Sequence, residues 1–391
     1  MLSACNSSVE KTKHTVKIMP NSITESIVVG ENLELNFFSR KYKNVQLLCT
    51  NSYVTELIHP ITKDGLLSFE IPKNITQKIG VLSWKIIGSK NELSGNITIQ
   101  PKTSAKQLET YVGPPSIETR DNDFTMFVTI PADEYDNPIE NNTDVHIKHQ
   151  FLNTITDDIV KTKNFFTYKN IYAPSKSGRL LLSSAVKNTN SKEYSVTVFP
   201  SHAKGFTIST YRNHNYADGN QIVTLTTSII KDKNDNIISD GTYVSFYIKT
   251  NTGENLQTQG LTIGGIATAK LLHPYKKSIW NINAEVAGLA NSKSVSIVFE
   301  QALKDFEVNF LNTNSTIKIG PLQSFMQQKI PDGFKVELAI YEQEQLIKTL
   351  VDDSYNGYVN FDLNPLEFKS GKYDLEISSG GIIKSFKNIK L

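Results

Sequence analysis

The 391-residue sequence lacks the features that would place it in several specialised classes of protein. No stretch approaches the about 20 apolar residues that a membrane-spanning helix needs. The formal net charge is only +2, with acidic and basic residues mixed along the chain, which argues against a nucleic-acid partner. Only two cysteines occur, so the chain is not a disulfide-stapled scaffold. Cys49 is expected to be a buried free thiol, with a disulfide to Cys5 as the alternative.

Motifs for common catalytic chemistries are also missing. There is no Gly-x-Ser-x-Gly elbow, no phosphate-binding loop and no dinucleotide fingerprint. His146 and His149 are three residues apart, and such positions on a strand face opposite sides, so they cannot chelate one ion together. Asp157 and Asp158 are adjacent and would also face opposite ways, unlike a glycosidase pair. The sequence therefore predicts a protein that is not an enzyme, with no catalytic residues and no cofactor.

What the sequence has in abundance is alternation of apolar and polar residues with a period of two. The alternation is clear in the segments 124–130, 223–229 and 373–377. Turn sequences such as Asp240-Gly241 separate these segments. Many short strands with frequent turns predict an all-β chain of four tandem Ig-like β-sandwich domains in an elongated array.

Internal repeats suggest how the domains are ordered. The segment 124–130 aligns with 223–229, and Asp133 then falls on Asp232. Further along, Gly178 aligns with Gly265 and the segment 194–198 with 280–284. This offset is shorter by about a dozen residues, which predicts an insertion over 152–170 in the first copy. A second pair of repeats lies at the two ends of the chain, so the predicted order is type A, B, B, A. The predicted parts are a lipobox remnant and tether at 1–15 and domains at 16–103 (type A), 104–202 (type B, with the insertion 152–170), 203–302 (type B) and 303–391 (type A).

The segment 217–286 resembles the bacterial Ig-like domains of invasin- and intimin-type proteins. The resemblance rests on Ala217-Asp218-Gly219-Asn220, on Gly241-Thr242-Tyr243-Val244-Ser245-Phe246 and on Gly264-Gly265-Ile266-Ala267-Thr268-Ala269. It covers about half of the chain, because the segment 121–200 matches in part. The resemblance implies a rigid stacked spacer or an adhesive stalk, and it carries over no catalytic residue.

The start of the chain, Leu2-Ser3-Ala4-Cys5, resembles the lipobox of bacterial lipoproteins. In that family the cysteine is acylated, which implies a lipid anchor on Cys5 and a place at the bacterial outer membrane, on its periplasmic face or at the cell surface. The basic and apolar segments that precede a lipobox are missing before Leu2, and a chance match of four residues is the alternative.

Two groups of residues are candidates for contacts with ligands. The acidic loops suit polar turns, and the alternative is a weak calcium site between stacked domains. The aromatic residues in or just after the predicted insertion form a candidate partner-contact surface; the alternative is that Phe165 and Tyr168 plug the sandwich edge. The calcium candidates are Asp133, Asp136, Asp232 and Asp235, and the contact candidates are Phe165, Phe166, Tyr168 and Tyr172.

These observations predict a non-enzymatic, lipid-anchored protein of the cell envelope. It would be a scaffold or binding subunit of an outer-membrane or surface assembly, or an adhesin. Its expected partners are the membrane, through the lipid on Cys5, and other envelope proteins. The alternative is a carbohydrate-binding surface lipoprotein that works beside a transporter or hydrolase, for which an exposed aromatic platform would be the distinguishing feature.

Overall fold

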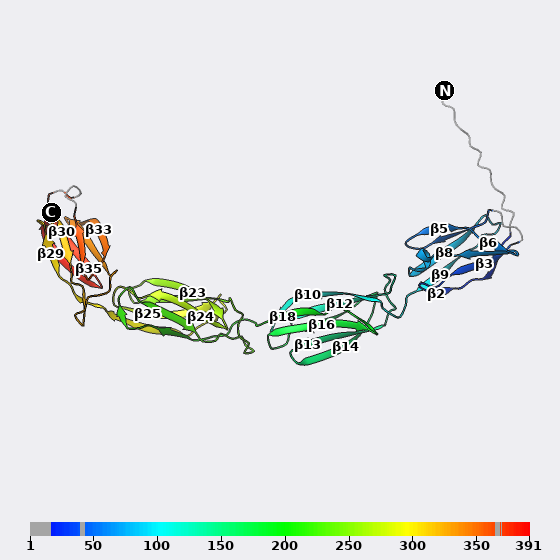
Figure 1. Cartoon of the computed structure of the whole chain (residues 1–391), viewed down its shortest axis with the longest axis horizontal. Coiled ribbons are helices and arrows are strands. Elements are labelled where there is room, and N and C mark those ends of the chain that lie inside the picture. The colour runs from blue at the N-terminus through cyan, green and yellow to red at the C-terminus, as the bar shows by residue number, and fades with distance from the viewer. Residues whose placement is uncertain (1–16, 40–43, 364–367, 369) are drawn as a thin grey trace, which may run out of the picture. The chain divides into compact units, whose positions relative to one another are not determined.

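The computed structural model describes residues 17–39, 44–363, 368 and 370–391, and these form an almost entirely β-structured chain (Figure 1). They contain 36 strands and a single short helix, α1 (Lys73–Thr76). None of the described helical segments has the length and apolar character needed to cross a membrane. The chain falls into two compact units, Met1–Val198 and Phe199–Leu391. Four separate clusters of buried apolar side chains confirm the predicted fold of tandem Ig-like β-sandwiches.

The first sandwich packs its core between two sheets. Phe37 and Phe69 meet edge to face, with ring centroids 5.9 Å apart, and Trp84 packs against Phe37 at 5.6 Å. Cys49 is a free thiol buried in this core, as predicted. One sheet has the order β1 (Met19–Ser22), β3 (Glu34–Phe38), β7 (Leu66–Glu70), β6 (Ile61–Lys63), and the other has the order β2 (Ser26–Val28), β9 (Ser94–Gln100), β8 (Gly80–Ile87), β4 (Gln46–Thr50), β5 (Thr55–Ile58).

The second sandwich, in the same unit, has one small sheet and one larger sheet. Phe127 is fully buried between them, on strand β12. The small sheet has the order β10 (Gln107–Gly113), β12 (Phe124–Ala132), β15 (Thr167–Tyr172). The larger sheet has the order β11 (Ser116–Glu118), β18 (Tyr194–Phe199), β16 (Gly178–Val186), β13 (Asp144–Phe151), β14 (Thr154–Lys161), with β17 (Thr189–Asn190) beside β16.

The third sandwich, in the second unit, repeats this arrangement strand for strand. Its small sheet comprises β19 (Ile208–Tyr211), β21 (Ile222–Thr227) and β24 (Ile266–Leu272). Its larger sheet comprises β20 (Tyr216–Ala217), β27 (Val295–Gln301), β25 (Ser278–Val286), β22 (Tyr243–Thr250) and β23 (Asn255–Ile263), with β26 (Ala290–Asn291) beside β25. Strand β23 also pairs with β24, so the two sheets form one path of hydrogen-bonded strands.

This correspondence corrects the predicted insertion over 152–170. That segment forms β14 and the start of β15, and the third sandwich has β23 and β24 in the same places. The two copies are therefore nearly equal in length here. The prediction failed because it matched Gly178 with Gly265, whereas the strand pairings match β16 with β25, which begins at Ser278.

The alignment of the first strands also needs a shift of one residue. Thr125, Phe127 and Thr129 are buried on β12, and the buried positions on β21 are Val223, Leu225 and Thr227. Strand residues 124–129 therefore correspond to 222–227, and the third sandwich has one extra residue before Ile230. A slip of one residue would turn every side chain of the strand to the opposite face of the sheet.

One sheet of the fourth sandwich matches four strands of the first. Its order β33 (Gln345–Asp353), β32 (Lys335–Glu342), β35 (Lys372–Ser379), β36 (Ile382–Lys390) corresponds to β5, β4, β8, β9. Phe334 and Ile340 are fully buried in its core. Its strands are β28 (Leu303–Asp305), β29 (Val308–Leu311), β30 (Thr316–Ile319), β31 (Gln323–Ser324), β32 (Lys335–Glu342), β33 (Gln345–Asp353), β34 (Val359–Asp362), β35 (Lys372–Ser379) and β36 (Ile382–Lys390).

Candidate functional site

The outer face of the sheet formed by β10, β12 and β15 is rich in aromatic side chains. The register of the strands places Tyr111, Val128 and Tyr168 in one row across the sheet. In another row Phe124 lies opposite Tyr172, with ring centroids 5.6 Å apart. Tyr111, Tyr168 and Tyr172 are 54%, 53% and 61% exposed. Because the solvent face of an antiparallel sheet is commonly polar, so many exposed rings on one face set this sheet apart.

Half-buried apolar side chains fill the space between these rings. Met126, Val128 and Ile130 alternate with the fully buried positions of β12, and they therefore share the outer face with the tyrosines. The hydroxyl of Tyr111 donates a hydrogen bond to the carboxylate of Glu109, and this bond raises the pKa of Tyr111. We call the set Tyr111, Phe124, Met126, Val128, Ile130, Tyr168 and Tyr172 the aromatic face.

The other two contact candidates, Phe165 and Phe166, lie in the turn between β14 and β15. Phe166 is half-buried, and its ring stacks on Tyr168 at a centroid distance of 6.3 Å. Phe165 packs against Phe166 at 5.3 Å and is 50% exposed. Neither Phe165 nor Tyr168 is buried as a plug of the sandwich edge. Phe165, Phe166 and Tyr168 thus form one continuous group of rings, and Tyr172 lies further along the same strand.

The corresponding face of the third sandwich carries polar and aliphatic side chains. The row of Phe124 and Tyr172 is replaced there by Ile222 and Leu272, which are 48% and 54% exposed. In place of the row Tyr111, Val128, Tyr168 it has Ser209, Thr226 and Thr268. One exposed tyrosine remains there, Tyr211, beside Thr224 on β21. Because the strands of this sheet and their pairings with one another are the same in both sandwiches, the fold does not require an aromatic face.

The acidic loop of the second sandwich is built around a buried aspartate. Asp133 is 1% exposed, and its Oδ1 accepts hydrogen bonds from the backbone N–H groups of Tyr135 (2.8 Å) and Asn137 (2.9 Å). The side-chain amide of Asn137 donates to both carboxylate oxygens of Asp133. Asp136 lies at the turn with a φ of 63° and accepts a hydrogen bond from the side chain of Gln107.

The third sandwich repeats this loop. Asp232 is fully buried, and its Oδ1 accepts from the N–H groups of Asn234 (2.8 Å) and Asn236 (2.9 Å). Its Oδ2 accepts from the N–H of Ser201 at 3.0 Å. Asp235 has a φ of 63° and pairs with Lys204 at 2.6 Å. Turn chemistry accounts for these contacts, and a calcium ion would have to displace the amide donors from both buried carboxylates.

Cys5, the predicted lipidation site, lies outside the described residues. The other cysteine, Cys49, is on β4. Burial raises the pKa of the Cys49 thiol to about 12, so this thiol stays protonated and unreactive at neutral pH.

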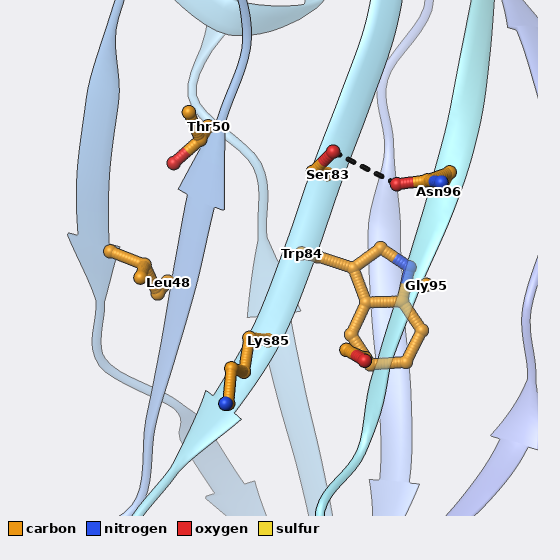
Figure 2. Close-up of a pocket in the computed structure, with 8 residues that line it drawn as sticks. Leu48, Thr50, Ser83, Trp84, Lys85, Gly95 and Asn96 are labelled. Atoms are coloured by element: carbon orange, nitrogen blue, oxygen red, sulfur yellow. Dashed lines mark hydrogen bonds between the residues drawn. The ribbon is translucent and has the colours of Figure 1, made fainter.

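A hollow of about 330 Å³ lies on the first sandwich over β4, β8 and β9 (Figure 2). Gly95 lies over the indole of Trp84, and a Cβ atom at Gly95 would come within 2.7 Å of the ring, so only glycine fits there. Ser83 donates a hydrogen bond to Asn96 Oδ1 at 2.8 Å beside it. The lining consists of Leu48, Thr50, Ser83, Trp84, Lys85, Ser94, Gly95 and Asn96. This lining has no carboxylate or imidazole that could serve acid–base catalysis.

The third sandwich also contains a cluster of titratable residues that the sequence did not predict. His214, Asp218 and His273 each place a possible ligand atom within 4.8 Å of the others. His273 follows the end of β24, whereas His214 and Asp218 flank β20, so the cluster forms only when the sandwich folds. The sequence contains one sign of this cluster, the spacing His214-x-x-x-Asp218. In a β-structured chain this spacing does not indicate a site by itself, because the third residue, His273, is distant in the sequence.

No protein-family model matches the sequence, and comparison with curated proteins gives no match. Solved structures share its fold. FdeC, an Escherichia coli adhesin, is 12% identical, with a TM-score of 0.50 over 73% of this chain and 96% of its own. Invasin, a bacterial integrin-binding protein, is 13% identical, with a TM-score of 0.45 over 96% of this chain and 79% of its own. InvD of Yersinia pseudotuberculosis is 14% identical, with a TM-score of 0.42 over 74% and 98%. At 12% identity the likeness to FdeC establishes the fold alone, and this is the fold that the sequence predicts.

Proposed function

We propose that this chain is a non-enzymatic, adhesin-like binding protein of the bacterial cell envelope, and that the aromatic face of its second sandwich contacts the partner. The observation that carries the proposal is the exposure of three tyrosines on one sheet face, whose counterpart in the third sandwich has one exposed tyrosine, Tyr211, among polar and aliphatic side chains. Adhesins such as FdeC have the same tandem fold, which supports a role at the cell surface.

The chemistry of the aromatic face suits a protein partner best. Tyrosine gives a large contact area with few rotatable bonds and carries a hydroxyl for hydrogen bonding, and it is enriched where interfaces gain most of their affinity. Met126, Val128 and Ile130 add half-buried apolar side chains to the same face. Such a surface is typical of the centre of a protein–protein interface, where charged residues are depleted.

A glycan is the second candidate partner, because the row containing Tyr111 and Tyr168 also forms an exposed aromatic platform. Sugar rings stack on such platforms, while groups at their edges donate and accept hydrogen bonds. Glu109 and Asn170 lie on the same outer face and could provide those hydrogen bonds. This arrangement keeps the carbohydrate-binding alternative open as the competitor to be tested.

The test compares variants of the full chain on defined surfaces. Labelled wild type, the double variant Tyr168→Ser/Tyr172→Ser and the matched control Tyr211→Ser are applied to cultured epithelial cells and to a printed glycan array. We expect the double variant to bind the cells at least about 30-fold more weakly, since one interface hot spot contributes about 2 kcal/mol or more. The control should bind like wild type.

The two partner classes are separated by treating the cells before binding. Binding that protease treatment abolishes indicates a protein partner, whereas binding that survives protease and is lost after periodate oxidation indicates a glycan. Equal binding of the double variant and wild type on every surface would contradict the role of the aromatic face.

Anchoring through Cys5 is a separate part of the proposal. It is supported by the small residues Ser3 and Ala4 before the cysteine and by the polar stretch that follows. In cells that express the chain behind a lipoprotein signal peptide, Cys5→Ser should move the protein from the membrane fraction to the soluble fraction. Unchanged membrane fractionation of Cys5→Ser would overturn the anchor without affecting the proposed contact face.

A further inference from the structure

We propose that His214, Asp218 and His273 form a binding site for one divalent transition-metal ion, best matched by zinc. Two imidazoles and one carboxylate are a donor set that zinc commonly takes, with a fourth position left for water. One possible ligand atom from each residue lies within 4.8 Å of the others. The site lies wholly within the third sandwich and does not depend on the proposed contact face.

The separation of His214 and Asp218 suits two ligands of one ion. His214 Nε2 lies 3.3 Å from Asp218 Oδ2. A charge-assisted N–H···O hydrogen bond is shorter, at about 2.7–2.9 Å. Zn–N distances of about 2.0–2.1 Å and Zn–O distances of about 2.0–2.2 Å place two ligands of a tetrahedral ion about 3.3–3.5 Å apart. The observed distance is therefore longer than a strong ion-paired hydrogen bond and equal to the edge of a zinc coordination tetrahedron.

His273 has a buried lone pair that needs a partner. Its side chain is fully buried, and Nδ1 donates a hydrogen bond to the backbone carbonyl of Tyr216 at 2.9 Å. This bond fixes the proton on Nδ1 and leaves Nε2 as an acceptor, for which the described part of the chain offers no donor. Histidines that bind metals typically donate their other N–H to a backbone carbonyl or carboxylate in this way. Nδ1 is the atom of His273 that approaches Asp218, 3.4 Å from Oδ1, so binding of a cation through Nε2 requires the imidazole ring to reorient.

Asp218 is held in place by its own turn. Its Oδ1 accepts from the backbone N–H groups of Asn220 and Gln221, both at 3.1 Å. The carboxylate is 7% exposed, and Oδ2 faces His214. Orientation by backbone amides lowers the entropic cost of presenting this oxygen to an ion.

His214 is the ligand through which an ion would enter, because its side chain is 35% exposed. Without metal, the N–H of Tyr216 donates to His214 Nδ1 at 3.1 Å, so the imidazole proton is on Nε2, towards Asp218. Coordination through Nε2 requires this proton to move to Nδ1, so the ring must turn away from the Tyr216 amide, and the neutral imidazole binds the ion without a net release of a proton.

The charge of Arg212 opposes a cation at the cluster. Its guanidinium lies over the ring of Phe299, 4.7 Å from the centroid, and the pKa of His273 is lowered first by burial and to a smaller extent by this charge. The same repulsion acts on a bound ion. Replacing Arg212 by an uncharged side chain of similar length should therefore tighten metal binding, which a purely structural role of the cluster would not produce.

The experiment titrates zinc chloride into the full chain, freed of metal with a chelator, by isothermal titration calorimetry. We expect one saturable site per chain, an affinity at least tenfold weaker in His214→Ala, and an affinity several-fold tighter in Arg212→Met. The control is His146→Ala, which removes an exposed histidine that pairs with Asp157 at 3.0 Å in the second sandwich. Cobalt in place of zinc should give the visible absorption of a tetrahedral ion.

His214→Ala is the main variant because His214 is partly exposed and its loss should leave the fold intact, as circular dichroism can verify. Asp218→Asn is the second variant, since its side-chain oxygen can still accept from the turn amides. The proposal is overturned if zinc shows no saturable binding, or if it binds His214→Ala and Asp218→Asn as tightly as wild type. A loss of affinity equal in the His146→Ala control would also overturn it.

Discussion

The second and third sandwiches have the same strands in the same order, yet they present different outer surfaces. Each strand from β10 to β18 has a counterpart from β19 to β27, and both contain an acidic loop around a buried aspartate. The row Tyr111, Val128, Tyr168 in the second sandwich becomes Ser209, Thr226, Thr268 in the third. Inward positions are constrained by packing, whereas outward positions are free to take up a function.

A second difference lies at positions that face inward. Where the third sandwich has the buried Ile248 on β22, the second has the partly buried His149 on β13. After the ends of β24 and β15, the third has His273 where the second has Ala173. The titratable groups therefore differ between the two sandwiches although the backbone does not.

The largest expected effect is on stability, and it concerns the acidic loop that the two sandwiches share. Asp133→Ala and Asp232→Ala should each lower the free energy of unfolding of their sandwich by about 3 kcal/mol or more, because several buried amides lose their acceptor at about 1–3 kcal/mol each. Calorimetric unfolding of the full chain measures both, and Asp136→Asn, at an exposed turn position, is the neutral control. If one of the two substitutions lowered the free energy of unfolding only slightly while the other lowered it strongly, the two loops would not be equivalent.

The next effect tests whether the outer face alone carries recognition. Ser209→Tyr and Thr268→Tyr, introduced together into a chain that carries Tyr111→Ser and Tyr168→Thr, transfer the tyrosine row to the third sandwich. We expect a recovery of cell binding of about tenfold, or 1.4 kcal/mol, because the strand framework is the same. No recovery would mean that neighbouring residues such as Phe165 and Phe166 are also required.

His149 should make the stability of the second sandwich depend on pH in a way that the third sandwich does not share. Burial lowers the pKa of His149 in the folded protein, and the charge of Asp158 opposes this in part. The unfolded chain, in which histidine titrates near pH 6.5, therefore binds the proton more readily. Stability from this residue is fully present above about pH 6.5 and is lost as the pH falls, by at most about 1.4 kcal/mol per pH unit.

His149→Ile should reduce the acid sensitivity of the second sandwich. Calorimetry at pH 7.5 and 5.5 measures it, with His146→Gln on the outer face as the control. An unchanged pH dependence in His149→Ile would show that another group causes the acid sensitivity.

The smallest expected effect is on stability at the aromatic face itself. Tyr168→Thr and its mirror change Thr268→Tyr should each alter the free energy of unfolding by no more than about 0.5 kcal/mol, since both positions face solvent. Urea unfolding of the two variants beside wild type measures this. A cost of 2 kcal/mol or more for Tyr168→Thr would mean that the face stabilises the sandwich and that its aromatic character is structural.

Much of the fold could be predicted from the sequence because the period of two marks which residues face a core. Phe127 and Leu225 are both fully buried within segments recognised by their alternation. The false insertion arose because short strands offer little sequence to align, so that Gly178 was matched with Gly265 and the segment 194–198 with 280–284. Only the pairing of β16 with β13 and of β25 with β22 shows which strands correspond.

The candidate sites differ in how far the sequence could predict them. Phe165, Phe166, Tyr168 and Tyr172 are close in the sequence, so their grouping was visible, although Tyr111 and Phe124 join them only through the register of β10, β12 and β15. The cluster of His214, Asp218 and His273 was not visible, because its third member lies on a different strand connection.

The sequence by itself determined that this protein is a chain of tandem Ig-like sandwiches, since burial of one face of each strand leaves its mark at every second residue. It also determined the acidic turns, because the hydrogen bonds of Asp133 and Asp232 are mostly local. Tertiary structure alone decided which outward residues became one aromatic face and which titratable residues met at the end of the third sandwich. Hydrogen-bonded pairing of strands distant in sequence sets those contacts, and neither composition nor periodicity encodes it.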